Sequence, residues 1–132
     1  MQGQVISIID DDAAVRAAEA RLLTSMGFTV DAFASANEFL KSSRLDDTLC
    51  IVVDVEMPGM SGLELQDYLV ARGVNIPIIF VTAFPEDRIR ERAMKGGAVC
   101  FLSKPFNEAA LLECVERTLK RRGSADDSGP GA

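Results

Sequence analysis

The sequence predicts an α/β domain with five parallel strands in a doubly wound sheet of order 2-1-3-4-5. Three observations lead to this fold. Short apolar runs alternate five times with segments of helical character, which is typical of parallel strands with helices on both faces of a sheet. Most of these runs are continuous and rich in β-branched residues, as expected of strands that are buried on both faces. The length of 132 residues suits one domain with a full core.

The strands are expected where apolar residues run without a break or alternate with polar ones. They are Val5–Ile9, Phe28–Phe33, Leu49–Asp54, Ile76–Val81 and Ala98–Leu102. The alternating pattern of the second run indicates one exposed face, near the edge of the sheet. Pro77 stands at the start of the fourth run, where a missing N–H group is tolerated.

The helices are expected after each strand, and each has a start or stop signal. They are Ala13–Met26, Ser35 to about Ser43, Ser61–Gly73, Pro85–Lys95 and Asn107–Arg122. Asp12 and Asn107 cap the first and the last helix. A Ser followed three residues later by Glu, the pattern of a capping box, opens the second helix at Ser35 and the third at Ser61. Residues 44–48 between the second helix and the third strand form a polar loop.

The domain is expected to span residues 1–122. Residues 123–132 are rich in Gly, Ser and Asp, which predicts a flexible tail. This tail is either a truncated linker to a further domain or the end of a stand-alone protein.

The composition restricts the chemistry. The chain has no His, which excludes Ser-His and Cys-His catalysis and His-ligated zinc. Cys50, Cys100 and Cys114 are scattered among apolar residues and are expected to be small buried hydrophobes. The net charge of −6 disfavours binding to nucleic acid or anionic membranes. No apolar run approaches the roughly 20 residues that span a bilayer, and no signal peptide is evident, so the chain is predicted to be cytoplasmic.

Charged and polar residues follow the predicted strands at one edge of the sheet. Asp10 and Asp11 follow the first strand, Asp54 ends the third, Thr82 follows the fourth and Lys104 follows the fifth. Open α/β sheets bind ligands at this carboxyl edge. Three crowded carboxylates repel one another unless a hard divalent cation, Mg²⁺ or Mn²⁺, neutralises them. The arrangement fits an aspartate, Asp54, that accepts a phosphoryl group beside the cation and Lys104.

These residues lie in four motifs, at the ends of four strands. The motifs are Ile8-Ile9-Asp10-Asp11-Asp12, Asp54 to Gly62, Val81-Thr82-Ala83 and Phe101 to Phe106. In this order they make residues 4–121 resemble the receiver domain of bacterial two-component response regulators. The stretches Gly96-Gly97-Ala98 and Lys104-Pro105-Phe106 are most similar to the subgroup that regulates transcription through a helix-turn-helix output domain.

The resemblance implies a role for each acidic residue. Asp54 is the phosphoacceptor, and its phosphoryl group comes from a phosphohistidine of a sensor histidine kinase. Asp10 and Asp11 hold Mg²⁺ together with Asp54 and the backbone carbonyl of Glu56.

The resemblance also implies a switch. Thr82 hydrogen-bonds the phosphoryl group and moves with it, and Lys104 pairs with another phosphoryl oxygen. Phe101 is the aromatic residue that turns inward when Thr82 moves. The peptide bond between Lys104 and Pro105 is expected to be cis.

Two residues are expected to tune the rate of phosphoryl chemistry. Glu56, two residues after Asp54, adds a carboxylate near the phosphoryl site and alters the lifetime of the phosphoryl group. Phe84, two residues after Thr82, places a bulky apolar group at the rim, where it limits the access of water.

The implied output surface consists of the fourth helix, the fifth strand and the fifth helix. This face controls dimerisation or an output domain, so a second copy of the chain and a C-terminal DNA-binding domain join the kinase as expected partners. The domain itself is expected to bind neither nucleic acid nor a membrane. It assists its own phosphorylation and dephosphorylation but has no independent substrate turnover.

Three other functions use the same sheet or site. A flavodoxin-like FMN carrier needs a phosphate loop of Ser, Thr and Gly after the first strand, where this chain has carboxylates. A Mg²⁺-dependent aspartyl-phosphate hydrolase needs a hydroxyl group after its Asp-x-Asp nucleophile, which the stretch Asp10–Ala14 lacks. A pseudo-receiver that only binds proteins is disfavoured because every expected site residue is present.

Overall fold

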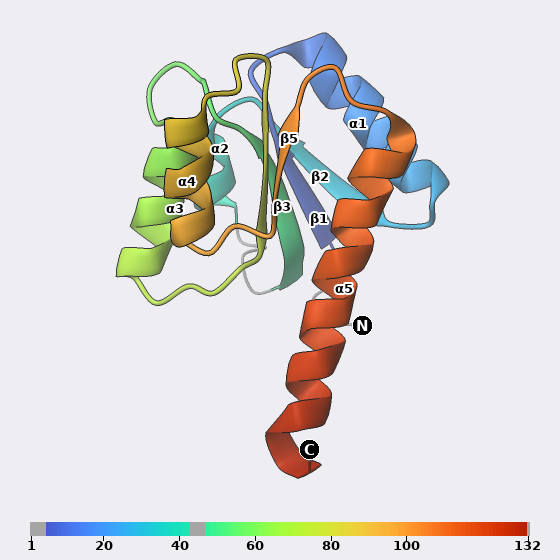
Figure 1. Ribbon diagram of the computed structural model, residues 1–132. Coiled ribbons are helices and arrows are strands. Elements are labelled where there is room, and N and C mark those ends of the chain that lie inside the picture. The colour runs from blue at the N-terminus through green and yellow to red at the C-terminus, as the bar shows by residue number, and fades with distance from the viewer. Residues whose placement is uncertain (1–4, 43–46, 132) are drawn as a thin grey trace.

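The computed structural model describes the backbone of residues 5–42 and 47–131 and the side chains of these residues up to Lys120. Strands and helices alternate along the chain (Figure 1). The strands are β1 (Val5–Ile9), β2 (Thr29–Phe33), β3 (Thr48–Asp54), β4 (Ile78–Thr82) and β5 (Cys100–Ser103). The helices are α1 (Ala13–Ser25), α2 (Ala36–Lys41), α3 (Gly62–Ala71), α4 (Asp87–Lys95) and α5 (Glu108–Gly131).

The strands form one parallel sheet in the order β2-β1-β3-β4-β5. Helices α1 and α5 cover one face of this sheet, and α2, α3 and α4 cover the other (Figure 1). The predicted fold class and strand order are therefore confirmed. In the part of the chain that the structure describes, no helix is long and apolar enough to cross a membrane.

Each face of the sheet has its own apolar core, because successive side chains of a strand point to opposite faces. Val53 and Phe80 pack with residues of α2, α3 and α4. Val52 and Val81 pack with residues of α1 and α5 on the other side. The three cysteines are buried, as predicted. β2 lies at the edge of the sheet and has no fully buried residue, which agrees with its alternating pattern.

Several predicted boundaries are wrong by one or two residues. Thr48 is not in a loop but opens β3, because it pairs with Val5 of β1 and is buried. Residues 44–46 of that loop lie outside the described residues. β2 begins after Phe28, whose N–H still donates to Leu23 of α1. β5 begins after Ala98, whose N–H donates to the last turn of α4 at Ala93.

The start signals of the helices are confirmed with one correction. The side chains of Asp12 and Asn107 accept N–H groups of the first turns of α1 and α5. Ser61 and Glu64 form a complete capping box at α3. At α2 the Ser35 hydroxyl accepts the N–H of Glu38, but the Glu38 carboxylate reaches the N–H of Ala34 instead of that of Ser35.

The backbone of α5 continues to Gly131, past residue 122 where the sequence places the end of the domain. Figure 1 shows this last part of α5 extending beyond the sheet. Side chains after Lys120 lie outside the described residues, so the domain boundary and the nature of the tail stay predictions.

Candidate functional site

The site lies at the carboxyl edge of the sheet, where three neighbouring strands and β5 deliver polar side chains. Asp10 follows β1, Asp54 is the last residue of β3, Thr82 is the last residue of β4, and Lys104 follows β5. These strands are parallel, so their carboxyl ends meet at one edge. Strand length and strand order thus bring the four side chains to the same edge of the sheet.

Three carboxylates meet at this edge. Asp10, Asp11 and Asp54 each offer an oxygen within 4.8 Å of the others. Asp10 and Asp54 are buried, whereas Asp11 is exposed. Turns that follow the strands hold the two buried groups in place, because Asp10 Oδ1 accepts the N–H of Asp12 at 2.9 Å and Asp54 Oδ1 accepts the N–H of Glu56 at 3.0 Å.

The ammonium group of Lys104 joins the two buried carboxylates. Lys104 Nζ donates to Asp10 Oδ2 at 2.9 Å and to Asp54 Oδ2 at 2.8 Å. Burial would lower the pKa of Lys104, but the hydrogen bonds with Asp54 and Asp10 outweigh it, so the net pKa is raised. Burial raises the pKa of Asp54, and the hydrogen bond from Lys104 offsets only part of this rise. The side chain of Lys104 is 16% exposed, so these ion pairs are mostly shielded from water.

The donor set fits a hard divalent cation. Mg²⁺ prefers carboxylate and carbonyl oxygens, with water completing its coordination shell. The exposed Asp11 leaves the cluster open to solvent on one side, and the cluster has one more carboxylate than Lys104 contacts. A second cation would therefore offset the remaining repulsion. Asp10, Asp11 and Asp54 are the residues that could hold it, with the backbone of Glu56 next to Asp54.

Thr82 is buried, and its hydroxyl group is fully engaged. Thr82 Oγ1 donates to Glu56 Oε1 at 2.7 Å and accepts the N–H of Phe84 at 3.0 Å. The hydroxyl proton is therefore directed at Glu56. The sequence suggested a carboxylate near the site at position 56 but gave no signal that it binds Thr82.

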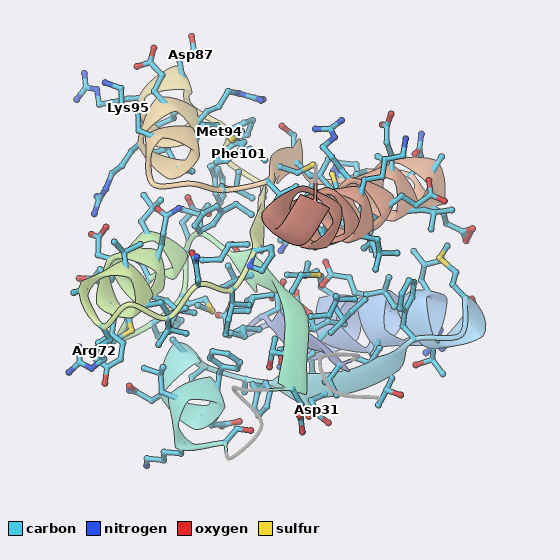
Figure 2. The ribbon with its side chains drawn as sticks, turned by 90° about the horizontal axis from the view of Figure 1, so that it is seen from below. Asp31, Arg72, Asp87, Met94, Lys95 and Phe101 are labelled. Atoms are coloured by element: carbon cyan, nitrogen blue, oxygen red, sulfur yellow. The ribbon has the colours of Figure 1, made fainter. Side chains whose placement is uncertain are left out.

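The two predicted aromatic residues lie in different environments. Phe84 is exposed, with 68% of its surface accessible to solvent. Phe101 is buried on β5, and the guanidinium carbon of Arg90 on α4 lies 5.0 Å from the centre of its ring. Figure 2 shows Phe101 beside α4. The Lys104–Pro105 peptide bond is cis.

Sequence reasoning missed two residues at this site. A Cβ atom on Gly62 would lie 2.5 Å from the backbone oxygen of Asp54, so only glycine lets the start of α3 approach β3 this closely. Glu19 of α1 is buried, and burial raises its pKa to about 7, with a further contribution from Asp10. The signal that could have identified Glu19 is its place among the regularly spaced apolar residues of the first helix.

Comparisons with known proteins extend these findings. The family profile described as response regulator receiver domain matches residues 6–116. Nodulation protein W of Bradyrhizobium diazoefficiens is 45% identical over 122 residues, which cover 89% of this chain and 54% of that protein. Transcriptional regulatory protein FixJ of Azorhizobium caulinodans is 45% identical over 116 residues, which cover 88% of this chain and 55% of that protein. The chain thus spans about half the length of these curated relatives.

The fold is also found among solved structures. The crystal structure of FixJ-N matches with a TM-score of 0.81 and 37% sequence identity, over 91% of this chain and 96% of that chain. The match therefore extends across the sheet and the helices on both of its faces.

Proposed function

The chain belongs to the family of response regulator receiver domains of two-component systems, and on this premise we propose that Asp54 is its phosphoacceptor. The observation that carries the proposal is the position of Asp54 at the end of a central strand. Its carboxylate lies close to two others, those of Asp10 and Asp11, and is hydrogen-bonded to Lys104. Because the side chain is 10% exposed, an incoming phosphoryl donor can reach it from the carboxyl edge.

The proposed reaction transfers a phosphoryl group from a phosphohistidine of a sensor kinase. A carboxylate oxygen of Asp54 forms a bond to phosphorus, the P–N bond breaks, and the imidazole leaves with the electron pair. Lys104 stabilises the charge on the phosphoryl oxygens, since its ammonium already contacts Asp54 Oδ2. A bound Mg²⁺, held by Asp10, Asp11, Asp54 and the carbonyl of Glu56, would offset further negative charge.

The proposed switch begins at Thr82. The phosphoryl group adds a charge of about −1.5 to −2 at the end of β3, and it is a stronger acceptor for the Thr82 hydroxyl than the Glu56 carboxylate. Thr82 then leaves Glu56, and Phe101 follows within the core between α4 and β5. The surface of α4, β5 and α5 changes in consequence, as a shift between two populations of one fold.

We further propose the partners that this surface serves. A second copy of the chain, or an output domain that binds DNA, would contact α4, β5 and α5. The curated relatives extend beyond the matched segment, and FixJ is named a transcriptional regulatory protein. Regulation of transcription is thus the proposed role of the full-length protein, and the cytoplasm is its predicted location.

Labelling with acetyl phosphate and Mg²⁺, followed by intact mass measurement, tests the proposal. We expect the native chain to gain one phosphoryl group that hydroxylamine removes, as it does other acyl phosphates. Asp54→Asn should abolish the gain. Asp67→Asn is the matched control, because Asp67 is exposed on α3 and pairs only with Arg92 among the described ion pairs. Stoichiometric labelling of Asp54→Asn would contradict the assignment.

The same preparations separate the other functions of this fold. A hydrolase would turn over p-nitrophenyl phosphate repeatedly, and a flavin carrier would show flavin absorbance. A pseudo-receiver would remain unlabelled.

A further inference from the structure

Glu19 is a buried acid that the proposed phosphoryl chemistry leaves without a role. It lies on the inner side of α1, and the residue is only 5% exposed. Neither of its carboxyl oxygens has a hydrogen-bond partner among the described residues. Buried carboxyl groups are ordinarily hydrogen-bonded or paired with a cation. A buried carboxylate in this state can still accept hydrogen bonds from a donor group.

Glu19 faces a cavity that also reaches Lys104. The cavity has a volume of about 590 Å³ and is bordered by α1 and by the segment from Lys104 to Glu108. Most of its wall is apolar, with Val15 and Leu22 on α1 and Phe106 opposite them. Lys104 is the one cation among the described residues that line it. Lys104 is therefore the charged donor that this lining offers to Glu19, beside the neutral amide of Asn107.

The charges around Glu19 are those of the phosphoacceptor site. Burial is the main reason that its pKa rises to about 7, Asp10 and Asp54 raise it further, and Lys104 lowers it. Glu19 is thus electrostatically coupled to Lys104 and to the two carboxylates that Lys104 now contacts.

Lys104 and a divalent cation draw on the same two carboxylates. The ammonium is bonded to Asp10 Oδ2 and Asp54 Oδ2, and both residues belong to the cluster that fits a divalent cation. Two cations close together repel each other, so we expect Lys104 to give up at least one of these oxygens when the cluster takes up a metal ion. The cavity next to Glu19 provides room for that movement.

We propose that Glu19 is a positioning residue for Lys104, a second acceptor that takes the ammonium group when a divalent cation binds to the acidic cluster. The inference rests on the proposed function in that it takes the cluster as a Mg²⁺ site. Before phosphorylation, Lys104 then has two positions, one on Asp10 and Asp54 and one on Glu19; a phosphoryl group on Asp54 is a further acceptor, which draws the ammonium back to the edge of the sheet. Glu19 makes Mg²⁺ binding stronger, because it gives the displaced ammonium a buried partner.

The test is a double-mutant cycle on Mg²⁺ affinity, measured by titrating Mg²⁺ alone and following backbone amide resonances. We expect Glu19→Gln to weaken Mg²⁺ binding about fivefold in the native background, and Glu19→Asp, which keeps the charge, to retain most of the affinity. In a Lys104→Met background, Glu19→Gln should change the affinity less than about twofold. Lys104→Gln serves as a second background that is independent of the apolar replacement.

The cycle separates the proposal from a general effect of charge. An equal loss in both backgrounds would mean that Glu19 acts only through its field on the cluster, and this would overturn the proposal. An unchanged affinity in the native background would overturn it as well. Glu108→Gln removes a charge from an exposed residue on the same cavity and should leave the affinity unchanged.

Misfolding of a variant and failure of the proposed function can each be distinguished from failure of this inference. Removal of an unpaired buried acid should raise the stability of Glu19→Gln toward urea, so a weaker Mg²⁺ affinity cannot follow from unfolding. Phosphorylation of Asp54 is measured on the same samples by mass. An absence of phosphorylation in the native chain would refute the proposed function, while the Mg²⁺ cycle still decides the role of Glu19.

Discussion

The hydrogen bond between Thr82 and Glu56 makes the proposed switch open to a quantitative test. Thr82 Oγ1 lies 2.7 Å from Glu56 Oε1, and the hydroxyl has one proton to donate. A phosphoryl group on Asp54 can receive that proton only after the bond to Glu56 breaks. Replacement of Glu56 by Ala therefore removes a competing acceptor and favours the phosphorylated arrangement.

The size of this effect follows from the geometry. A hydrogen bond to a charged group contributes about 1.5–3 kcal/mol, but Glu56 is exposed, and solvent reduces the value to about 1 kcal/mol. A change of about 1 kcal/mol corresponds to about a fivefold change in an equilibrium constant. We expect Glu56→Ala to bind beryllium trifluoride, a phosphoryl analogue, about fivefold more tightly in the presence of Mg²⁺.

Fluorine NMR of the bound analogue measures this affinity, and two further variants locate its origin. Glu56→Gln keeps an acceptor oxygen but loses the charge, so it separates the hydrogen bond from charge repulsion. In a Thr82→Val background, which has no hydroxyl group, Glu56→Ala should lose most of its effect. An equal or weaker affinity for the analogue in Glu56→Ala would refute the reasoning. A full gain in the Thr82→Val background would show that the gain does not pass through Thr82.

Three further outcomes are expected. Phe84→Ala should lose its phosphoryl group faster than the native chain, because water then reaches Asp54 more easily; an unchanged or slower rate of dephosphorylation would count against a role at the rim. Glu19 has a pKa of about 7 in the folded chain against an ordinary value of 4.5. The ionised acid therefore destabilises the folded chain, and this loss of stability is nearly absent below pH 4.5 and complete above pH 7. Glu19→Gln should thus be more stable than the native chain by about 3 kcal/mol at pH 8 and by little at pH 4.5, which urea unfolding at the two values measures. Gly62→Ala should lower the free energy of unfolding by about 1–3 kcal/mol, since its Cβ would meet the backbone oxygen of Asp54 at 2.5 Å; native stability would show that α3 can shift away from β3.

The strands and the site residues were predictable because their sequence signals are local. The parallel topology then determines where the ends of the strands meet. The run from Leu49 to Asp54 indicates a buried strand, and a carboxylate at its end has to lie at the carboxyl edge. Asp10 and Lys104 follow other parallel strands, and their meeting with Asp54 confirms the inference from topology. The order of the parallel strands determines which side chains share the carboxyl edge of the sheet.

The hydrogen bonds within the site were not predictable in this way. Spacing places Thr82 and Glu56 at the same edge, but side-chain rotamers decide that the hydroxyl donates to Glu56. The buried side of α1 was also hard to predict. Its apolar residues Val15 and Leu22 are only partly buried, whereas Glu19 and Leu23 are buried. A carboxylate in the buried stripe weakens the apolar period on which the prediction rests.

The two polar side chains that the proposed phosphoryl group needs are each bonded to another acceptor in this structure. Lys104 contacts Asp10 as well as Asp54, and Thr82 contacts Glu56. Phosphorylation would exchange these acceptors for phosphoryl oxygens, so it replaces hydrogen bonds and does not create them from free groups. The free energies of the two arrangements then differ by the difference between acceptors, which is smaller than a whole hydrogen bond. A domain built in this way can populate both arrangements, and one phosphoryl group is sufficient to change which of them prevails.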